Sequence, residues 1–297
     1  MEYKEFFAAF KKELDERLGG DGSTEVVRVD KNNGNGKEGL MIKGGDSPAL
    51  PVIYPEEFYR FHKEMGEDVV SIAEKAAYIC MREREKKEVL DEFCRDILSW
   101  ETAKEYLMPE LIRAEWNREI LKEAASIPFL DLAVCFRLQK ERPGGGIFSF
   151  RLSKKQTASW GLSERELMEQ GRKNLRCVDH KITGLTELME GIFGAGFFED
   201  EETDFAVLTT PERTYGTSGI LRKELLADYA DRLGKNLFLI PSSVHEFILM
   251  PDDGKTDLEK LECLINRVNS EQVAREEQLS DHAYYYDREK GEIRLRP

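Results

Sequence analysis

The sequence predicts an α+β protein with a mainly antiparallel sheet and flanking helices. Short segments in which apolar and polar residues alternate occur in pairs around turn residues, which is typical of β-hairpins. Longer segments carry apolar residues at three- and four-residue steps, which is typical of amphipathic helices. Strands outnumber simple strand–helix–strand units and hairpins are frequent, which favours an antiparallel sheet over a parallel one.

The N-terminal part is expected to be a small α/β region followed by a helical middle segment. Its first helix is indicated by apolar residues at helical spacing and by Gly19-Gly20, which ends it. The elements expected there are a helix over residues 3–18, strands over 26–29, 39–42 and 51–54, a helix after Pro55, and a mostly helical stretch over 67–122. Within that stretch, the expected buried positions are Val69, Ile72, Ala73, Ala76, Ile79 and Cys80.

The pattern changes near Pro128, and we place a domain boundary there, between residues 1–126 and 127–297. Strands are expected over residues 129–139, 147–152, 205–208, 237–240, 244–250, 283–287 and 293–295. Helices are expected near residues 163–174, 185–192, 221–233 and 257–268. Ser163 with Glu166, and Thr256 with Glu259, have the spacing of capping boxes at two of these helices.

Charge and composition exclude several classes of function. The formal net charge is −14, so a phosphate backbone is repelled at long range and no nucleic-acid partner is expected. Apolar runs are too short to cross a bilayer, and the charged start has no signal-peptide core, so no membrane partner is expected. The five cysteines are scattered and form no C-x-x-C pair, which is typical of a reduced, cytoplasmic protein.

Residues that could carry out chemistry are concentrated in the last quarter of the chain. Two of the four histidines lie there, each adjacent in sequence to a carboxylate, and the candidate catalytic residues are His245, Glu246, Asp281 and His282. If residues 244–250 form a regular strand, His245 and Glu246 point to opposite faces and cannot act as a couple. We therefore expect any site to combine His245 or Glu246 with the segment of Asp281 and His282 as a sheet neighbour.

Polar and aromatic residues near these positions are the candidate ligand-binding residues. They are Ser242, Ser243, Tyr215, Ser218, Tyr284 and Tyr286. The turn containing Tyr215 reads Tyr-Gly-Thr-Ser-Gly and precedes a predicted helix, where free amide groups can accept an anion. The alternative is a structural strand-to-helix turn in which Thr217 or Ser218 caps the helix, and this interpretation is preferred.

The sequence lacks the complete motifs that identify most cofactor and catalytic sites. It contains no H-E-x-x-H, G-x-S-x-G or G-x-x-x-x-G-K-[ST], and Gly194-Ala195-Gly196 has no third glycine and no preceding strand. The acidic run over residues 199–202 has no calcium-loop spacing. His62 and His180 have no evident partner. We therefore expect no metal and no cofactor.

Several motifs along the whole chain resemble an uncharacterised family from anaerobic Gram-positive bacteria. They are Met1-Glu2-Tyr3-Lys4-Glu5-Phe6, Lys31-Asn32-Asn33-Gly34, Pro51-Val52-Ile53-Tyr54, Phe129-Leu130-Asp131-Leu132, Trp160-Gly161-Leu162-Ser163, Tyr215-Gly216-Thr217-Ser218-Gly219, the PSSVHE stretch from Pro241 and the LSDHAYYYD stretch from Leu279. The family has no established activity. The resemblance therefore implies a shared architecture and a cytoplasmic bacterial protein, and no catalytic residues.

Two functional hypotheses follow, with a third that the charge makes weak. The favoured one is a non-catalytic binding or regulatory module that uses the rim of the C-terminal sheet, with an unknown protein or small ligand as partner. The alternative is a hydrolase or metal-assisted enzyme built from His245, Glu246, Asp281 and His282. The third, nucleic-acid binding, predicts an affinity that falls with salt.

Overall fold

The computed structural model describes residues 1–19, 22–43, 51–85, 87–142, 146–188 and 204–295, without the side chains of residues 83–87. The chain forms two compact units. Unit 1 comprises Met1–Lys31, Asn35–Ala103 and Lys140–Phe148, and unit 2 comprises Asn32–Gly34, Lys104–Gln139 and Ser149–Pro297. Compactness does not establish where a domain folds independently, so the boundary expected near residue 126 stays a prediction.

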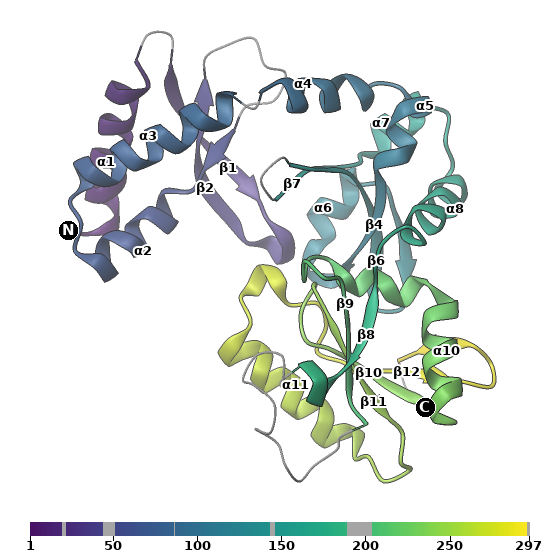
Figure 1. The fold of residues 1–297 in the computed structure, drawn as a ribbon. Coiled ribbons are helices and arrows are strands. Elements are labelled where there is room, and N and C mark those ends of the chain that lie inside the picture. The colour runs from purple at the N-terminus through teal and green to yellow at the C-terminus, as the bar shows by residue number, and fades with distance from the viewer. Residues whose placement is uncertain (20–21, 44–50, 86, 143–145, 189–203, 296–297) are drawn as a thin grey trace. The chain divides into compact units, whose positions relative to one another are not determined.

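Unit 1 packs helices against a three-stranded antiparallel sheet of order β1-β2-β3 (Figure 1). Its elements are α1 (Tyr3–Leu18), β1 (Ser23–Asp30), β2 (Gly36–Lys43), β3 (Val52–Ile53), α2 (Pro55–Met65), α3 (Val69–Glu85), α4 (Lys87–Asp96) and α5 (Trp100–Ala103). The expected core stripe of α3 is buried except at Ile79, which is 51% exposed, while Ala77 is buried. Phe6 and Phe10 of α1 stack and complete this core.

The first sheet of unit 2 has the order β4-β6-β5, with β7 also paired to β6. These strands are β4 (Leu107–Arg113), β5 (Ser126–Phe129), β6 (Leu132–Glu141) and β7 (Ile147–Arg151). The helices that follow or precede them are α6 (Arg118–Glu123), α7 (Lys154–Ser159) and α8 (Glu164–Leu175), with a short 3-10 helix, η3 (Glu115–Asn117), after β4. Ser163 and Glu166 form the expected capping box of α8.

The second sheet of unit 2 has six antiparallel strands in the order β13-β12-β10-β11-β9-β8. They are β8 (Lys181–Gly184), β9 (Ala206–Thr209), β10 (Leu237–Pro241), β11 (Phe247–Pro251), β12 (Tyr284–Asp287) and β13 (Glu292–Arg294). The flanking helices are α10 (Lys223–Leu233) and α11 (Leu258–Gln272), and the 3-10 helices are η1 (Asn32–Gly34), η4 (Gly216–Leu221) and η5 (Arg275–Glu277). α10 and α11 lie on either side of this sheet in Figure 1, and consecutive residues of β10 are buried on both faces.

The α+β class and the antiparallel sheets are confirmed. One expected helical stretch is wrong, because residues 107–113 form strand β4 rather than helix. β4 pairs with β6 along its whole length, and this tertiary pairing overrides the local pattern. Residues 129–139 also differ: Leu130 has a φ of 56° and, with Asp131, turns the chain between β5 and β6.

Two further corrections concern the last quarter of the chain. The strand expected over residues 244–250 begins only at Phe247, because Pro241 and Phe247 close a hairpin whose loop is residues 242–246. The second capping box is also displaced, since Asp257, not Thr256, is the N-cap of α11 and accepts from the amide of Lys260.

Some expectations lie outside the described residues. They are the acidic run over residues 199–202, the Gly194-Ala195-Gly196 segment and most of the helix expected near residues 185–192. Among the residues that are described, no helix is both long enough and apolar enough to cross a membrane.

Candidate functional site

The loop between β10 and β11 carries His245 and Glu246 and is closed by its own polar side chains. Ser242 donates through its amide to the Glu246 carbonyl (3.2 Å) and through its hydroxyl to the Glu246 carboxylate (3.2 Å). The Ser243 hydroxyl accepts from the amide of His245 at 3.0 Å. These contacts define a loop geometry rather than an extended strand, so both side chains lie at the rim of the sheet.

The Tyr215–Gly219 turn packs directly against this loop. The amide of Tyr215 donates to His245 Nδ1 (3.2 Å), and the hydroxyl of Thr217 donates to the Val244 carbonyl (2.8 Å). A Cβ at Gly216 would lie 2.6 Å from the His245 carbonyl oxygen, so only glycine fits there. The two motifs that stood out in the sequence therefore form one junction.

Tyr215 holds a strained backbone conformation at this junction. Its φ is 51°, and Arg213, two residues earlier, has a φ of 50°. Left-handed conformations of non-glycine residues cost of the order of 1–3 kcal/mol and persist only where the surroundings enforce them. Neither Thr217 nor Ser218 caps a helix here: Tyr215 is the N-cap of η4 without a side-chain cap, and the Ser218 hydroxyl donates to the Tyr215 carbonyl at 3.0 Å.

A buried ion cluster lies under Tyr215. Glu110 of β4 is 3% exposed and accepts from Arg137 Nη1 and from Arg151 Nε, each at 2.7 Å. Arg137 also donates to the Tyr215 hydroxyl at 3.0 Å, and its guanidinium lies 4.9 Å from the centre of the Tyr215 ring. Burial would raise the pKa of Glu110, but the charges of Arg137 and Arg151 outweigh burial and lower it. The carboxylate is thus ionised and acts as a buried anchor for the strained turn.

A cavity of about 30 Å³ lies between this cluster and His180. That volume is about a tenth of the roughly 300 Å³ at which small-molecule pockets begin, so it suits a few water molecules rather than an organic substrate. His180 is 6% exposed, and burial, followed by the Arg222 charge, lowers its pKa to about 4. Its Nε2 lies 3.2 Å from the Ser218 hydroxyl, while its Nδ1 is buried without a hydrogen-bond partner among the described residues.

His180 and Ser218 have the residue types of a base and a nucleophile, but the geometry does not support catalysis. Ser218 is 3% exposed, so a substrate cannot reach its hydroxyl. No described carboxylate hydrogen-bonds to His180 Nδ1, whereas a catalytic base of this kind is oriented by such a group. A Cβ at Gly219 would lie 2.8 Å from the His180 ring, which indicates close structural packing instead.

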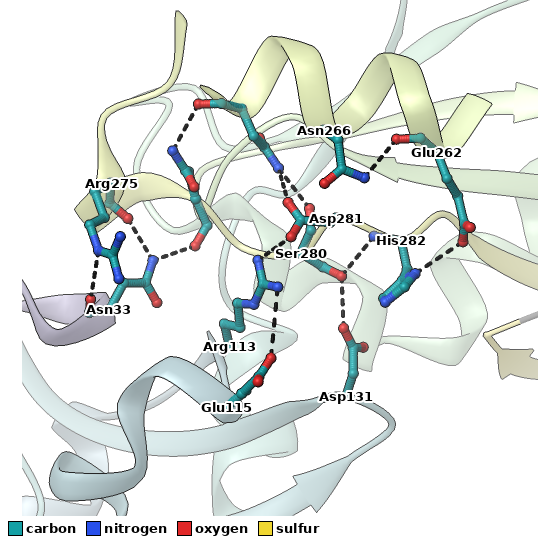
Figure 2. Close-up of polar contacts among 12 residues, drawn as sticks. Asn33, Arg113, Glu115, Asp131, Glu262, Asn266, Arg275, Ser280, Asp281 and His282 are labelled. Atoms are coloured by element: carbon teal, nitrogen blue, oxygen red, sulfur yellow. Dashed lines mark hydrogen bonds and ion pairs between the residues drawn. The ribbon is translucent and has the colours of Figure 1, made fainter. Parts of the chain in front are cut away.

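Asp281 and His282 belong to a second polar network, shown in Figure 2. Asp281 pairs with Arg113 of β4 at 2.6 Å and accepts from Asn269 of α11 at 2.9 Å. His282 Nδ1 lies 3.1 Å from the carboxylate of Glu262, which is also on α11. Asp281 therefore engages both helix α11 and strand β4, and His282 engages helix α11.

Asp131 ties the start of β12 to the β5–β6 turn. Its carboxylate accepts from the hydroxyl of Ser280 at 2.7 Å and from the hydroxyl of Tyr284 at 2.7 Å. Tyr284 is fully buried, and burial, followed by the Asp131 charge, raises the pKa of Tyr284 well above its ordinary value. The Tyr284 hydroxyl therefore stays protonated and acts as a donor inside the fold.

Asn33 of η1 extends the same network toward the rim. It is fully buried, with a φ of 59°, and its side-chain amide donates to the carbonyls of Arg275 (2.6 Å) and Gln278 (2.7 Å). Its amide and its side-chain oxygen form a reciprocal pair with the side chain of Asn117, at 2.7 and 2.8 Å. Three motifs of the sequence, at residues 31–34, 129–132 and 279–287, thus meet in one network.

A row of partly exposed aromatic and cationic side chains links the two networks at the rim. The ring centres of Tyr215 and His245 are 5.6 Å apart, and His245 Nε2 lies 3.7 Å from the Glu277 carboxylate. Two residues before Glu277, the guanidinium of Arg275 lies 4.7 Å from the centre of the Trp116 ring. The carbonyl of Glu277 accepts from the amide of Val244 at 2.8 Å, which joins the segments. We call Tyr215, His245, Glu277, Arg275 and Trp116 the rim row.

The predicted catalytic residues are distributed over separate partners. Glu246 contacts Ser242, His245 contacts Tyr215 and Glu277, Asp281 contacts Arg113 and Asn269, and His282 contacts Glu262. Among the described residues, no hydrogen bond or ion pair joins any of these four to another. Strand β12 pairs with β10 and not with β11, so the two segments are not adjacent strands. No group of three or more potential metal-ligating side chains occurs in the described part of the chain.

The predicted ligand-binding residues also have different surroundings. Tyr215 and Ser218 line the water-sized cavity, Ser242 and Ser243 close the β10–β11 loop, and Tyr284 is bonded to Asp131. Tyr286 is 2% exposed and lines a different cleft, described below.

Several residues central to these networks were not predicted as site residues. Glu110 lay in a segment expected to be helical, so its pairing with Arg137 could not be anticipated. His180 and Asn33 make their contacts across more than thirty residues of sequence, with Ser218 and with Arg275 respectively. For Arg137, the sequence did offer a signal, since it lies between the apolar residues Phe136 and Leu138 in the expected strand over residues 129–139 and so points to the opposite face.

Comparison with known proteins gives one match. The sequence model of a family of unknown function, DUF5688, matches residues 3–288. A search of curated proteins and a search of solved structures found no match.

Proposed function

Because the chain belongs to the DUF5688 family, whose function is unknown, we propose from its geometry that it is a non-catalytic, protein-binding module that uses the rim row. The observation that carries the proposal is the row itself: the Tyr215–His245 and Arg275–Trp116 pairs are both at least partly exposed and are linked through Glu277. Tyrosine, tryptophan and arginine dominate the energetics of protein interfaces.

The rim row is rigid, which favours a role in recognition. His245 Nδ1 accepts a hydrogen bond from the backbone amide of the strained Tyr215, and Arg137 donates a hydrogen bond to the Tyr215 hydroxyl. Arg275 is held by its Nε, which donates to the Asn33 carbonyl at 3.1 Å, and by stacking on Trp116. Side chains that are already ordered lose less conformational entropy on binding, so more of the contact energy appears as affinity.

The polar groups at the rim also suit a protein partner better than a small ligand. The cavity next to the row holds about 30 Å³, whereas small-molecule pockets measure about 300–1,000 Å³. The opposite charges of Glu277 and Arg275 in the row instead match the mixed charge of a protein surface. The location in the cell, expected to be the cytoplasm, is part of the same proposal.

Site-specific photo-crosslinking in cells tests this function. A photoreactive phenylalanine analogue replaces Ser243, beside the row, or, as the control, Asp253, an exposed residue beyond β11. We expect one discrete crosslinked protein from position 243 and none from position 253. The same products from both positions, or no product from position 243, would contradict the proposal.

The hydrolase or metal-assisted alternative is tested separately. Metal analysis of the purified chain and assays with ester, amide and phosphate substrates would be repeated with His245→Ala. A stoichiometric metal, or a turnover that is lost in His245→Ala, would favour the enzyme over the binding module.

A further inference from the structure

A cleft of about 310 Å³ opens in unit 2 and is formed by residues that do not belong to the rim row. Its walls come from the end of η4, the first turn of α10, the β12–β13 hairpin, the end of β5 and helix α8. Phe129, Leu226 and Ile293 supply apolar surface. The volume lies at the lower end of the range for small-molecule pockets, about 300–1,000 Å³.

Two cationic side chains line this cleft without an ion-pair partner among the described residues. Arg172 of α8 and Lys223 of α10 both line it and are both exposed. Within the described part of the chain, neither makes a hydrogen bond or an ion pair. In a chain of net charge −14, two unpaired cations at one cleft form a local positive site.

Tyr286 adds a hydroxyl that has no partner. Its side chain is 2% exposed, it lines the cleft, and its hydroxyl makes no hydrogen bond to any described residue. A hydroxyl without a partner in the protein is free to donate to a ligand in the cleft. Burial, followed by the charges of Asp231 and Asp228, raises the pKa of Tyr286, so the hydroxyl is a donor at neutral pH.

The start of α10 reinforces the positive character of the cleft. Lys223 is the first residue of this helix, no side chain caps the N-terminus, and the one carboxylate of the first turn, Glu224, is paired with Arg176 and Arg222. The N-terminal end of a helix carries a partial positive charge and favours anions. Glu292 is the single carboxylate among the described lining residues, and it is exposed to solvent. Asp228 and Asp231 do not line the cleft, and Asp231 pairs with Arg288 at 3.1 Å.

We infer that this cleft binds an amphipathic monocarboxylate, such as a medium-chain fatty acid or an arylalkanoic acid. The carboxylate pairs with Arg172 and Lys223 and accepts a hydrogen bond from the Tyr286 hydroxyl. The apolar body of the ligand covers Phe129, Leu226 and Ile293. The site shares no residue with the rim row, so its existence does not depend on the proposed protein-binding function.

Calorimetric titration with three probes that share one tail tests the inference: octanoate, octylamine and 1-octanol. Octanoate is expected to bind one site per chain at least tenfold more tightly than 1-octanol, with octylamine the weakest. Arg172→Gln and Lys223→Gln are each expected to weaken octanoate binding about tenfold, the effect of losing one charge-assisted hydrogen bond. Tyr286→Phe removes one neutral bond, and a loss of about threefold to tenfold is expected.

Lys173→Gln is the matched control, because this residue is exposed on the same helix and does not line the cleft. Its octanoate affinity is expected to equal that of the wild type, and circular dichroism confirms that each variant is folded. The inference is overturned if octanoate does not bind, if 1-octanol or octylamine binds as tightly, or if the lining variants behave like Lys173→Gln.

Discussion

Removal of the Glu110 carboxylate is expected to destabilise unit 2 strongly. Glu110 is 3% exposed and is the shared partner of Arg137 and Arg151, whose nitrogens each lie 2.7 Å from a carboxylate oxygen. In Glu110→Ala both guanidinium groups lose that partner while they stay mostly buried. The expected cost comes from these two uncompensated charges more than from the lost contacts.

Removing one partner of a buried ion pair typically costs about 3–5 kcal/mol, and we expect Glu110→Ala to fall in this range. At about 2–4 °C per kcal/mol for a domain of this size class, the melting temperature falls by roughly 6–20 °C. Glu110→Gln keeps the side-chain volume and one acceptor, so its expected cost is smaller, about 1.5–3 kcal/mol.

The difference in the free energy of unfolding between the wild type and Glu110→Gln also depends on pH. The pKa of Glu110 is lowered in the folded chain from 4.5, so the carboxylate contributes stability above that pH. This contribution is lost as the pH falls below 4.5 and through the lower folded value. The two proteins are therefore expected to differ in stability at pH 7 and to become equally stable in acid.

Urea denaturation followed by tryptophan fluorescence measures these free energies of unfolding. Glu169→Ala is the control, because Glu169 forms an exposed pair with Arg165, and no measurable change is expected. If Glu110→Ala is no less stable than Glu169→Ala, the interpretation of the buried cluster as an anchor is wrong.

Three other changes give equally specific outcomes. The pKa of His180 is about 4 when folded and 6.5 when free, so burial of the neutral ring contributes roughly 3 kcal/mol above pH 6.5. Relative to His180→Gln, the wild type should lose this free energy of unfolding as the pH falls from 6.5 to 4. Parallel pH profiles of the two proteins in urea denaturation would refute this prediction. Asn33→Ala removes three hydrogen bonds, two to the carbonyls of Arg275 and Gln278 and one from the Asn117 side-chain amide, with an expected loss of about 3 kcal/mol in the free energy of unfolding, whereas Asn266→Ala, on exposed helix surface, should be near neutral. Gly216→Ala places a Cβ 2.6 Å from backbone atoms and should reduce the melting temperature far more than Gly184→Ala, where nothing lies within 4 Å; equal effects would contradict the packing.

Much of the fold could be predicted because local patterns agreed with the tertiary structure. The helix over residues 3–18, the Ser163 capping box and the terminal hairpin around Gly291 each have signals within a few residues of sequence. Strand β4 had none, since Pro109 and Glu110 interrupt the alternation, and its partner residues in β6 lie about 20 to 30 residues further along the sequence. Only the pairing with β6 makes this segment a strand.

The site was predicted only in part, for a related reason. The PSSVHE and Tyr215–Gly219 segments were recognised, and they do meet, through Tyr215 and His245. The expected meeting of His245 with Asp281 and His282 assumed that residues 244–246 continue a strand next to β12. The loop at Pro241 and the intervening strand β10 prevent that arrangement, and no feature within the segment itself reveals which strand is its neighbour.

The protein-binding role is tested most directly by the dependence of crosslinking on the rim row. With the photoreactive residue at position 243, the yield of the crosslinked protein is compared between the otherwise unchanged chain and one that also carries Trp116→Ala and Arg275→Ala. Removal of this stacked pair is expected to reduce the yield at least tenfold while circular dichroism is unchanged. An undiminished yield from the folded double variant would show that the partner binds elsewhere.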